Sequence, residues 1–295
     1  MANTKIIQRR IRSVKNAKQI TKALEVVAAA RMRRVVQAVE SSRTYDNVAT
    51  TIMERIAHSH EARLHPFFGS AADKPTLYVV ITSDRGQAGA FNSNIFNLTI
   101  QFLKAEKHRP QVVVFGRKGA RFFANLGGID LKGAYEDIAD IPSVNVFVPL
   151  VEMINDTMAE GQIGSVKVVY TEFISSLSQK ASSFQLLPIS PDMAGDTTVT
   201  DKPVQEPDKT VYEFEPDTKD VLDEAIKLYF EAKLMQARIE SAASEHAMRM
   251  VAMGNANRNA SDLIDDLTLE LNATRQAAIT QEIAEITGGA EAIAA

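Results

Sequence analysis

The segment Ser83–Asn92 is the first place in the sequence where residue types and spacing could do chemistry. It follows a β-branched run and precedes a helix-like segment, which is where dinucleotide-binding domains carry a phosphate-binding loop. Gly86 and Gly89 are its only glycines, so the G-x-G-x-x-G spacing is missing, and no G-x-x-x-x-G-K-[ST] motif occurs in the chain. We therefore favour a tight β–α turn in which Asp84 and Arg85 form local hydrogen bonds, with nucleotide binding as the alternative.

The histidines are a second candidate. His58, His60 and His65 lie close together, which leaves a metal site open, although no carboxylate accompanies them in a recognisable motif. A solvated helix end is the simpler interpretation. The chain has no cysteine, which excludes disulfides, thiolate metal sites and thiol catalysis. We expect His246, on a helical seam described below, to be a packing residue with a hydrogen-bond partner.

Polar residues near the C-terminus are a third candidate. Arg275 and Gln276, with Asn272, Thr280 and Glu282 nearby, lie far from the central part of the chain. A helix that only had to be stable would carry apolar residues along its buried stripe. The pattern therefore indicates either a polar contact surface or a frayed helix end.

Charge is divided between the two ends of the chain. The net charge is only −4, but residues 1–43 carry 11 Lys/Arg and 2 Asp/Glu, whereas residues 213–295 carry 7 and 16. Opposite charge favours association of the two ends. A basic arm could also bind nucleic acid, but this one has no interleaved aromatic residues and no known nucleic-acid-binding signature. Nucleic-acid binding is therefore the less favoured alternative.

Helix breakers divide the chain into two arms and a middle. All 10 prolines lie between Pro66 and Pro216. No glycine precedes Gly69, and Gly254 is the only glycine in residues 196–287. Because Pro and Gly interrupt helices, two long helical arms are expected to flank a middle that contains the loops.

Each arm predicts one long helix. The first runs over about Thr4–Ala57 with Thr4 as its N-cap, and the second over about Thr218–Thr287, where Gly288 and Gly289 should end it. About 70 helical residues span roughly 105 Å, whereas a compact chain of this length has a radius of gyration of about 19 Å. The second helix must therefore protrude and needs a partner for its apolar stripe.

Two heptad positions of the second arm form a seam that is two-thirds apolar and rich in small residues. One position holds Leu222, Tyr229, Gln236, Ala243, Met250, Asn257, Ile264, Leu271 and Ala278, and the other holds Ala225, Ala232, Ile239, His246, Met253, Ala260, Leu267, Thr274 and Gln281. Since the first arm is the nearest partner, we expect an antiparallel coiled coil of the two arms.

The middle of the chain alternates strand-like and helix-like segments, which favours a mainly parallel sheet covered by helices. Strands are predicted at 77–82, 112–115 and 166–170, with a further candidate at 182–189, and helices near 93–107, 117–126 and 149–160. The predicted fold is α+β, a long antiparallel coiled coil of N- and C-terminal helices with a central Rossmann-like α/β domain. Its predicted parts are a helix in 1–60, the α/β domain in 70–190, an acidic Pro-rich linker in 191–217 and a helix in 218–295.

Four segments together resemble the gamma-subunit family of F-type ATP synthases. They are Ile20–Arg34, Ser83–Asn92, Ser244–Met253 and Asn272–Ala290, and they occur in the family's order along the whole chain. The resemblance implies a coiled coil inside a ring of three alpha and three beta subunits. It also implies a globular domain near the membrane, beside the epsilon subunit and on the c-ring. Such a chain transmits rotation that couples proton flow to ATP synthesis or hydrolysis.

The resemblance also implies site residues in contact with the beta subunit or active in coupling: Lys22, Leu24, Arg249, Arg275, Gln276, Thr280 and Glu282. Lys22 and Leu24 lie in the region that meets beta. Arg275 and Gln276 match a pair that hydrogen-bonds a beta loop, and the other three match positions implicated in coupling. No catalytic residue, cofactor, metal, nucleic acid or small-molecule substrate is expected of such a subunit.

Two departures from the family bear on regulation, and the start of the sequence bears on location. Gln87–Ala88 replaces a Leu-Cys pair, and the cysteine-bearing insertion of the chloroplast form is missing, so thiol regulation is not expected. A sequence that starts directly at the first helix looks bacterial. We therefore expect peripheral association, through the complex, with the cytoplasmic face of the bacterial plasma membrane. The alternative function is a Rossmann-like enzyme with a coiled-coil oligomerisation arm.

Overall fold

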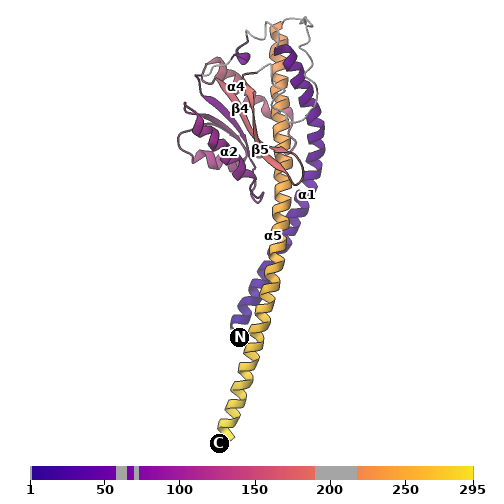
Figure 1. The fold of residues 1–295 in the computed structure, drawn as a ribbon, viewed down its shortest axis with the longest axis vertical. Coiled ribbons are helices and arrows are strands. Elements are labelled where there is room, and N and C mark those ends of the chain that lie inside the picture. Colours follow the sequence, from indigo (N-terminus) through magenta and orange to yellow (C-terminus); the bar gives the residue numbers. More distant parts are fainter. Residues whose placement is uncertain (1, 58–64, 70–72, 190–217, 295) are drawn as a thin grey trace. The chain divides into compact units, whose positions relative to one another are not determined.

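The computed structural model describes residues 2–57, 65–69, 73–189 and 218–294 (Figure 1). The chain forms two compact units. The terminal unit comprises Met1–Ala29 with Arg249–Ala295, and the sheet unit comprises Ala30–Met248. The predicted linker 191–217 lies outside the described residues.

Two long helices carry the ends of the chain. α1 spans Ala2–Ala57 and α5 spans Thr218–Ala294, and neither contains a proline (Figure 1). α1 begins before Thr4, so the prediction that Thr4 is its N-cap was wrong. α5 continues through Gly288 and Gly289, so the predicted end at these residues was also wrong. A glycine inside a helix costs only about 1 kcal/mol relative to alanine, which the good helix formers on both sides offset.

α1 and α5 run antiparallel in both units. In the sheet unit, Arg43 of α1 meets Glu240 of α5, with 2.9 Å between Nε and Oε1. In the terminal unit, Asn257 Nδ2 donates to the carbonyl oxygen of Lys18 at 3.0 Å. The predicted seam residues of α5 are buried or half-buried from Leu222 as far as Thr274 and Ala278. The predicted antiparallel coiled coil is therefore confirmed.

The sheet unit contains a five-stranded sheet with the strand order β3-β2-β1-β4-β5. The strands are β1 (Thr76–Ile81), β2 (Gln111–Phe115), β3 (Asp130–Tyr135), β4 (Ser165–Phe173) and β5 (Gln179–Leu187). Only β4 and β5 pair antiparallel, so the predicted mainly parallel sheet is confirmed. β3 was not predicted, because its sequence DLKGAY contains no β-branched residue.

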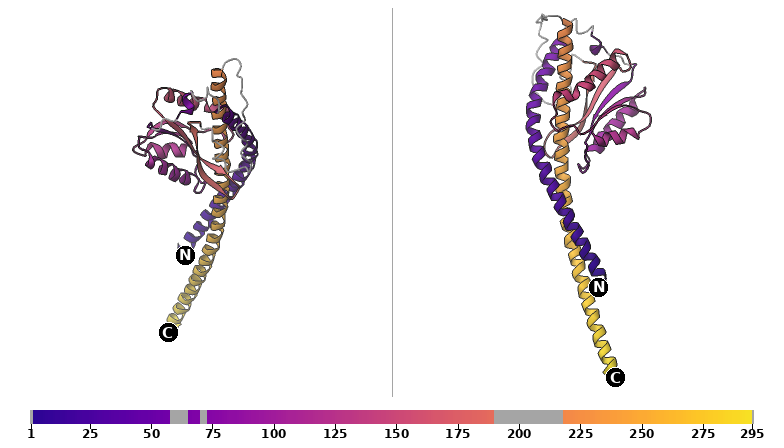
Figure 2. Two further views of the ribbon diagram at one scale, coloured as in Figure 1. Left: turned by 45° about the horizontal axis from the view of Figure 1, so that its top comes forward. Right: turned by 180° about the vertical axis from the view of Figure 1, so that it is seen from behind.

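Helices cover both faces of the sheet (Figure 2). They are α2 (Phe91–Ala105), α3 (Arg117–Ala124) and α4 (Val148–Ala159), and two 3₁₀ turns, η2 (Pro66–Phe68) and η3 (Val144–Phe147), complete the unit. Successive strand residues point to opposite faces. Val79 of β1 packs with Ile154 of α4 and Phe230 of α5 in one core cluster, whereas Val80 packs with Ile95 of α2 in another.

A third cluster joins the two long helices to the end of β4. Phe173 packs with Val35 and Val39 of α1 and with small residues of α5, among them Ala242 and Ala243. Along the described part of the chain, no helix is long and apolar enough to cross a membrane.

Candidate functional site

The loop after β1 is held by its own side chains. Asn92 accepts from the Ser83 N–H at 3.1 Å and donates to Ser83 Oγ at 2.7 Å. Asp84 Oδ1 accepts from the N–H groups of Arg117 and Asp137 at 3.0 and 3.2 Å. The expectation that Asp84 bonds locally was therefore wrong, because its partners lie 33 and 53 residues away. Asp84 instead ties the ends of β1, β2 and β3 together.

The N-terminus of α3 is filled by the chain itself. A helix N-terminus attracts phosphate because its first N–H groups point outward without partners. Here the Asp84 carboxylate accepts a hydrogen bond from the N–H of Arg117. The N–H of Lys118 donates to the Ser83 carbonyl oxygen, and that of Gly119 donates to Thr82 Oγ1, both at 3.0 Å. These N–H groups are therefore not available to a nucleotide phosphate, which disfavours the enzyme alternative.

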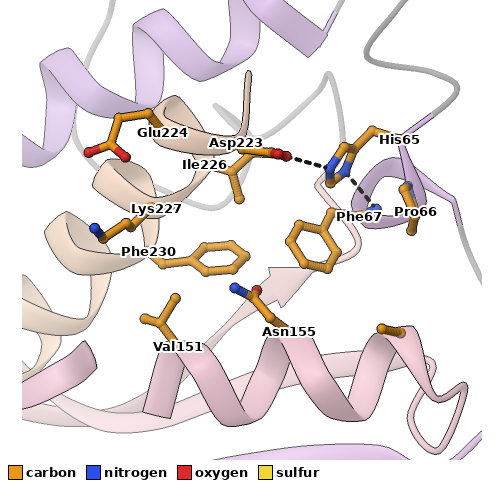
Figure 3. Close-up of a pocket in the computed structure, with 11 residues that line it drawn as sticks. His65, Pro66, Phe67, Val151, Asn155, Asp223, Glu224, Ile226, Lys227 and Phe230 are labelled. Atoms are coloured by element: carbon orange, nitrogen blue, oxygen red, sulfur yellow. Dashed lines mark hydrogen bonds and ion pairs between the residues drawn. The ribbon is translucent and has the colours of Figure 1, made fainter. Parts of the chain in front are cut away.

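A pocket of about 420 Å³ in the sheet unit contains the one candidate histidine that the structure describes (Figure 3). His65 Nε2 lies 3.1 Å from Asp223 Oδ1, and His65 Nδ1 accepts from the Phe67 N–H at 3.3 Å. Nε2 therefore carries the proton, and both ring nitrogens are engaged. The rings of Phe67 and Phe230 lie across the pocket with centroids 5.8 Å apart. The pocket thus contains a histidine whose two ring nitrogens are both hydrogen-bonded, next to two phenylalanine rings.

The candidate metal site comprises three histidines, of which the structure describes His65. His58 and His60 lie outside the described residues. Among the residues that the structure describes, no group of three His, Cys, Asp or Glu side chains could hold a metal ion. His246 is buried, at 3% exposure, and lies 2.9 Å from Asp140 Oδ2, as expected for a packing residue with a partner.

The terminal unit presents a basic stripe on α1. Lys15, Lys18 and Lys22 recur at i, i+3 and i+7, which places them on one helix face. With Asn257 and Ile264 of α5 they line a groove of about 520 Å³. The stripe is suited to an acidic partner.

The family resemblance implies two contact residues on α1, Lys22 and Leu24, and their side chains differ in exposure. Lys22 is exposed and pairs with Glu25 at 3.1 Å within α1. An exposed pair of this kind is worth only a few tenths of a kcal/mol, so Lys22 can exchange Glu25 for another carboxylate. Leu24 is half-buried.

The end of α5 is exposed on all sides. Every described side chain from Ile279 to Ala290 is exposed, and so are Arg275 and Gln276. Thr280 Oγ1 donates to the carbonyl oxygen of Gln276 at 3.0 Å, so this hydroxyl is turned back onto its own helix. Three large apolar side chains share one face of this segment: Ile279, Ile283 and Ile286.

The seven residues that the family resemblance implies do not form one cluster. Lys22 shares its groove with Asn257, and Arg275 lies 18 residues further along α5, about 27 Å at 1.5 Å per residue. Arg249 is half-buried. Sequence reasoning did not single out Lys15, Lys18 or the isoleucine stripe as contact residues, although their i, i+3/i+4, i+7 spacing was the available signal. The surface is a long helical track rather than a catalytic constellation.

Comparisons with known proteins agree over the whole chain. A family model described as ATP synthase matches residues 3–293. The ATP synthase gamma chain of Legionella pneumophila (strain Corby) is 38% identical over 302 residues, which cover 99% of this chain and 100% of the relative. That of Symbiobacterium thermophilum is 38% identical over 293 residues, which cover 99% of this chain and 98% of the relative.

Solved structures share the fold. In the Euglena gracilis mitochondrial ATP synthase OSCP/F1/c-ring, rotational state 3, one chain matches with a TM-score of 0.69 and 20% identity, covering 99% of this chain and 95% of that one. In the rotor of the same enzyme, rotational state 1, the TM-score is 0.65 at 19% identity, with 94% and 99% covered.

Proposed function

The chain belongs to the ATP synthase gamma chain family, and we propose that it is the central rotor shaft of an F-type ATP synthase. It transmits rotation between the membrane c-ring and the alpha/beta catalytic ring and so couples ion flow to ATP synthesis or hydrolysis. One charge that crosses about 100 mV releases only about 2.3 kcal/mol. Several ion steps must therefore be delivered through the shaft for each ATP.

The observation that carries the proposal is the exposed end of α5. A helix whose described residues are exposed all round over Ile279–Ala290 gains nothing from packing, and isolated helices of this length are marginal in water. Its three exposed isoleucines form an apolar stripe that a surrounding partner can cover, and Arg275 and Gln276 are exposed and can hydrogen-bond that partner. A ring of subunits that encloses the helix end can be this partner. The helix then contacts the ring without a permanent bond to any single subunit.

We propose that seven residues contact the beta subunit or act in coupling: Lys22, Leu24, Arg249, Arg275, Gln276, Thr280 and Glu282. The exposed charges favour contacts that form and break, because exposed ion pairs are individually weak. A uniformly apolar track would hold one subunit too firmly to turn. Lys15 and Lys18 extend the basic track beside Lys22.

The proposed partners are the alpha, beta and epsilon subunits and the c-ring. The proposed location is the cytoplasmic face of the bacterial plasma membrane, reached peripherally through the complex. The bacterial relatives, at 38% identity over 98 to 100% of their length, support this assignment.

Co-purification at native expression level followed by native mass spectrometry tests the proposal. We expect one copy of this chain with three alpha and three beta chains. A homo-oligomer or a free monomer would contradict it and favour the Rossmann-like enzyme. The rigorously pure chain should hydrolyse no ATP, and clear turnover would refute a non-catalytic role.

A further inference from the structure

β4 extends past the end of its neighbour β1. The pairing of these strands ends at Val80 and Val169, but β4 continues to Phe173, with only β5 on its other side. The polar backbone groups of Thr171 and Phe173 on the β1 side therefore have no strand to bond. Buried backbone groups need partners, because an unpaired one costs about as much as a lost hydrogen bond.

Side chains of α5 take the place of the missing strand. The Thr171 N–H donates to Ser241 Oγ at 3.1 Å, and Ser244 Oγ donates to the Thr171 carbonyl oxygen at 3.4 Å. The Phe173 N–H donates to Glu240 Oε2 at 3.3 Å. Glu240, Ser241 and Ser244 are all buried, at 0 to 4% exposure. The helix thus continues the hydrogen bonding of the sheet edge.

Arg43 brings α1 into the same arrangement. Its Nε donates to Glu240 Oε1 at 2.9 Å, and its Nη2 donates to the Phe173 carbonyl oxygen at 2.7 Å. Arg43, Glu240 and Phe173 therefore close a ring of hydrogen bonds between α1, α5 and β4. We call this ring, with the two serine contacts, the Glu240 junction: Arg43, Thr171, Phe173, Glu240, Ser241 and Ser244.

Stability alone does not account for a buried carboxylate here. Apolar replacement of a buried ion pair is often neutral or stabilising, and the best-attested use of such groups is to fix register. In the surrounding cluster α5 contributes three alanines, Ala242, Ala243 and Ala247, beside Ile239. Alanine side chains project little from the helix, so they oppose sliding less than large side chains do. A shift of α5 by one residue moves each side chain by about 1.5 Å along the axis and about 100° around it. Such a shift breaks the four junction bonds that α5 makes and leaves only the bond between Arg43 and the Phe173 carbonyl oxygen, which joins α1 to β4.

We propose that the Glu240 junction is a register lock, which fixes the axial and rotational position of α5 against β4 and α1 so that the two helices turn with the sheet without slip. The proposal rests on the proposed rotor function. Glu240 and Arg43 are positioning residues in this role. They transmit torque and touch no nucleotide.

The test uses the assembled ATP synthase in inverted membrane vesicles, with ATP hydrolysis and ATP-driven ion pumping measured together. In E240A and R43M we expect the ions pumped per ATP hydrolysed to fall at least threefold. The double variant should be no worse than either single variant, because both break one junction. E152Q, which alters an exposed carboxylate on α4 of the same unit, is the matched control and should keep the wild-type ratio.

A distance measurement on the purified full-length chain gives a second readout. The chain has no cysteine, so cysteines introduced at two exposed positions, Leu228 of α5 and Ser178 between β4 and β5, carry spin labels at those positions alone. The distance distribution between the two labels should be narrow in the labelled chain that keeps Glu240 and broader when E240A is added to it. A merely structural role would lower the unfolding temperature but leave the pumping ratio of assembled complexes unchanged.

Wild-type pumping ratio and distance distribution in E240A would overturn the proposal. If E240A does not assemble, E240Q decides. Glu240 accepts from Arg43 and Gln236 at Oε1 and from the Phe173 N–H at Oε2. An amide keeps only one acceptor oxygen and presents an N–H group on the other side, so we expect an intermediate loss, and a wild-type ratio overturns the lock. If the wild-type chain itself neither assembles nor pumps, the rotor function fails. If the wild type and all variants couple equally, only the lock fails.

Discussion

His246 Nε2 of α5 lies 2.9 Å from Asp140 Oδ2, so a buried ring is held by a half-buried carboxylate from the loop between β3 and η3. The Nη2 of Arg238 lies 3.9 Å from Asp140 Oδ1 and donates to the Ile138 carbonyl oxygen at 2.9 Å. This loop is therefore bonded to α5 at two positions, Arg238 and His246, which lie about two helical turns apart.

The pH dependence of stability should report this contact. Partial burial acts to raise the pKa of Asp140, but the hydrogen bond with His246 and the charges of Arg238 and Arg31 bring that pKa below its ordinary value. A depressed carboxyl pKa stabilises the fold above the unfolded pKa, about 3.9, and this contribution is lost as pH falls through the folded pKa. D140N should cost about 1 kcal/mol at pH 7, and the difference should shrink below about pH 4.

Urea unfolding of the two proteins between pH 7 and pH 3 measures this effect. D156N, which removes an exposed carboxylate of α4, is the control and should change stability by no more than about 0.5 kcal/mol. A D140N curve parallel to the wild-type curve over the whole range would show that Asp140 contributes no pH dependence.

Gly119 should tolerate no side chain. A Cβ there would lie 2.5 Å from Val114 Cγ1 and 2.6 Å from Thr82 Oγ1, and it would disrupt the bond that holds the α3 N-terminus. We expect G119A to lower the free energy of unfolding by about 1–3 kcal/mol. G127A, with nothing within 4 Å of the added Cβ, should be near neutral in the same denaturation experiment. Equal stability of the two variants would contradict the close packing of α3 on the sheet.

Arg275 should matter for coupling and not for folding. Its side chain is exposed, so R275A should change the free energy of unfolding by less than about 0.5 kcal/mol. ATP synthesis in vesicles should nevertheless fall severalfold, because a charged contact to the ring is lost. R258A is the control, because it removes an exposed arginine from an earlier turn of the same helix, and it should keep wild-type ATP synthesis. Unchanged synthesis in R275A would remove this residue from the proposed contacts.

Truncation separates the end of α5 from the sheet unit. Removal of residues 276–295 should weaken assembly or coupling, since the exposed segment is lost. The sheet unit should keep its free energy of unfolding to within about 1 kcal/mol, because the described side chains from Ile279 to Ala290 are exposed. Thermal unfolding followed by circular dichroism checks this, and collapse of the sheet unit would contradict the division into two units.

Much of the architecture could be predicted from the sequence because periodicity and helix breakers are local properties. The absence of proline from both arms predicted two long helices, and the heptad seam predicted their pairing. The runs around Val79, Val113 and Val168 predicted three parallel strands, because β-branched residues suit a sheet buried on both faces. Element ends were less predictable, as Gly288 shows, since one or two glycines are outweighed by their neighbours.

The sequence by itself determined the helical arms, the strand–helix alternation and the polar end of α5, because each depends on residues near one another in the chain. Only the tertiary structure decided what the polar residues of the middle do. Asp84 caps α3 from 33 residues away, and Arg43 meets Glu240 across 197 residues. A buried polar group takes whichever partner the fold brings within about 3 Å, and a one-dimensional pattern does not contain that distance.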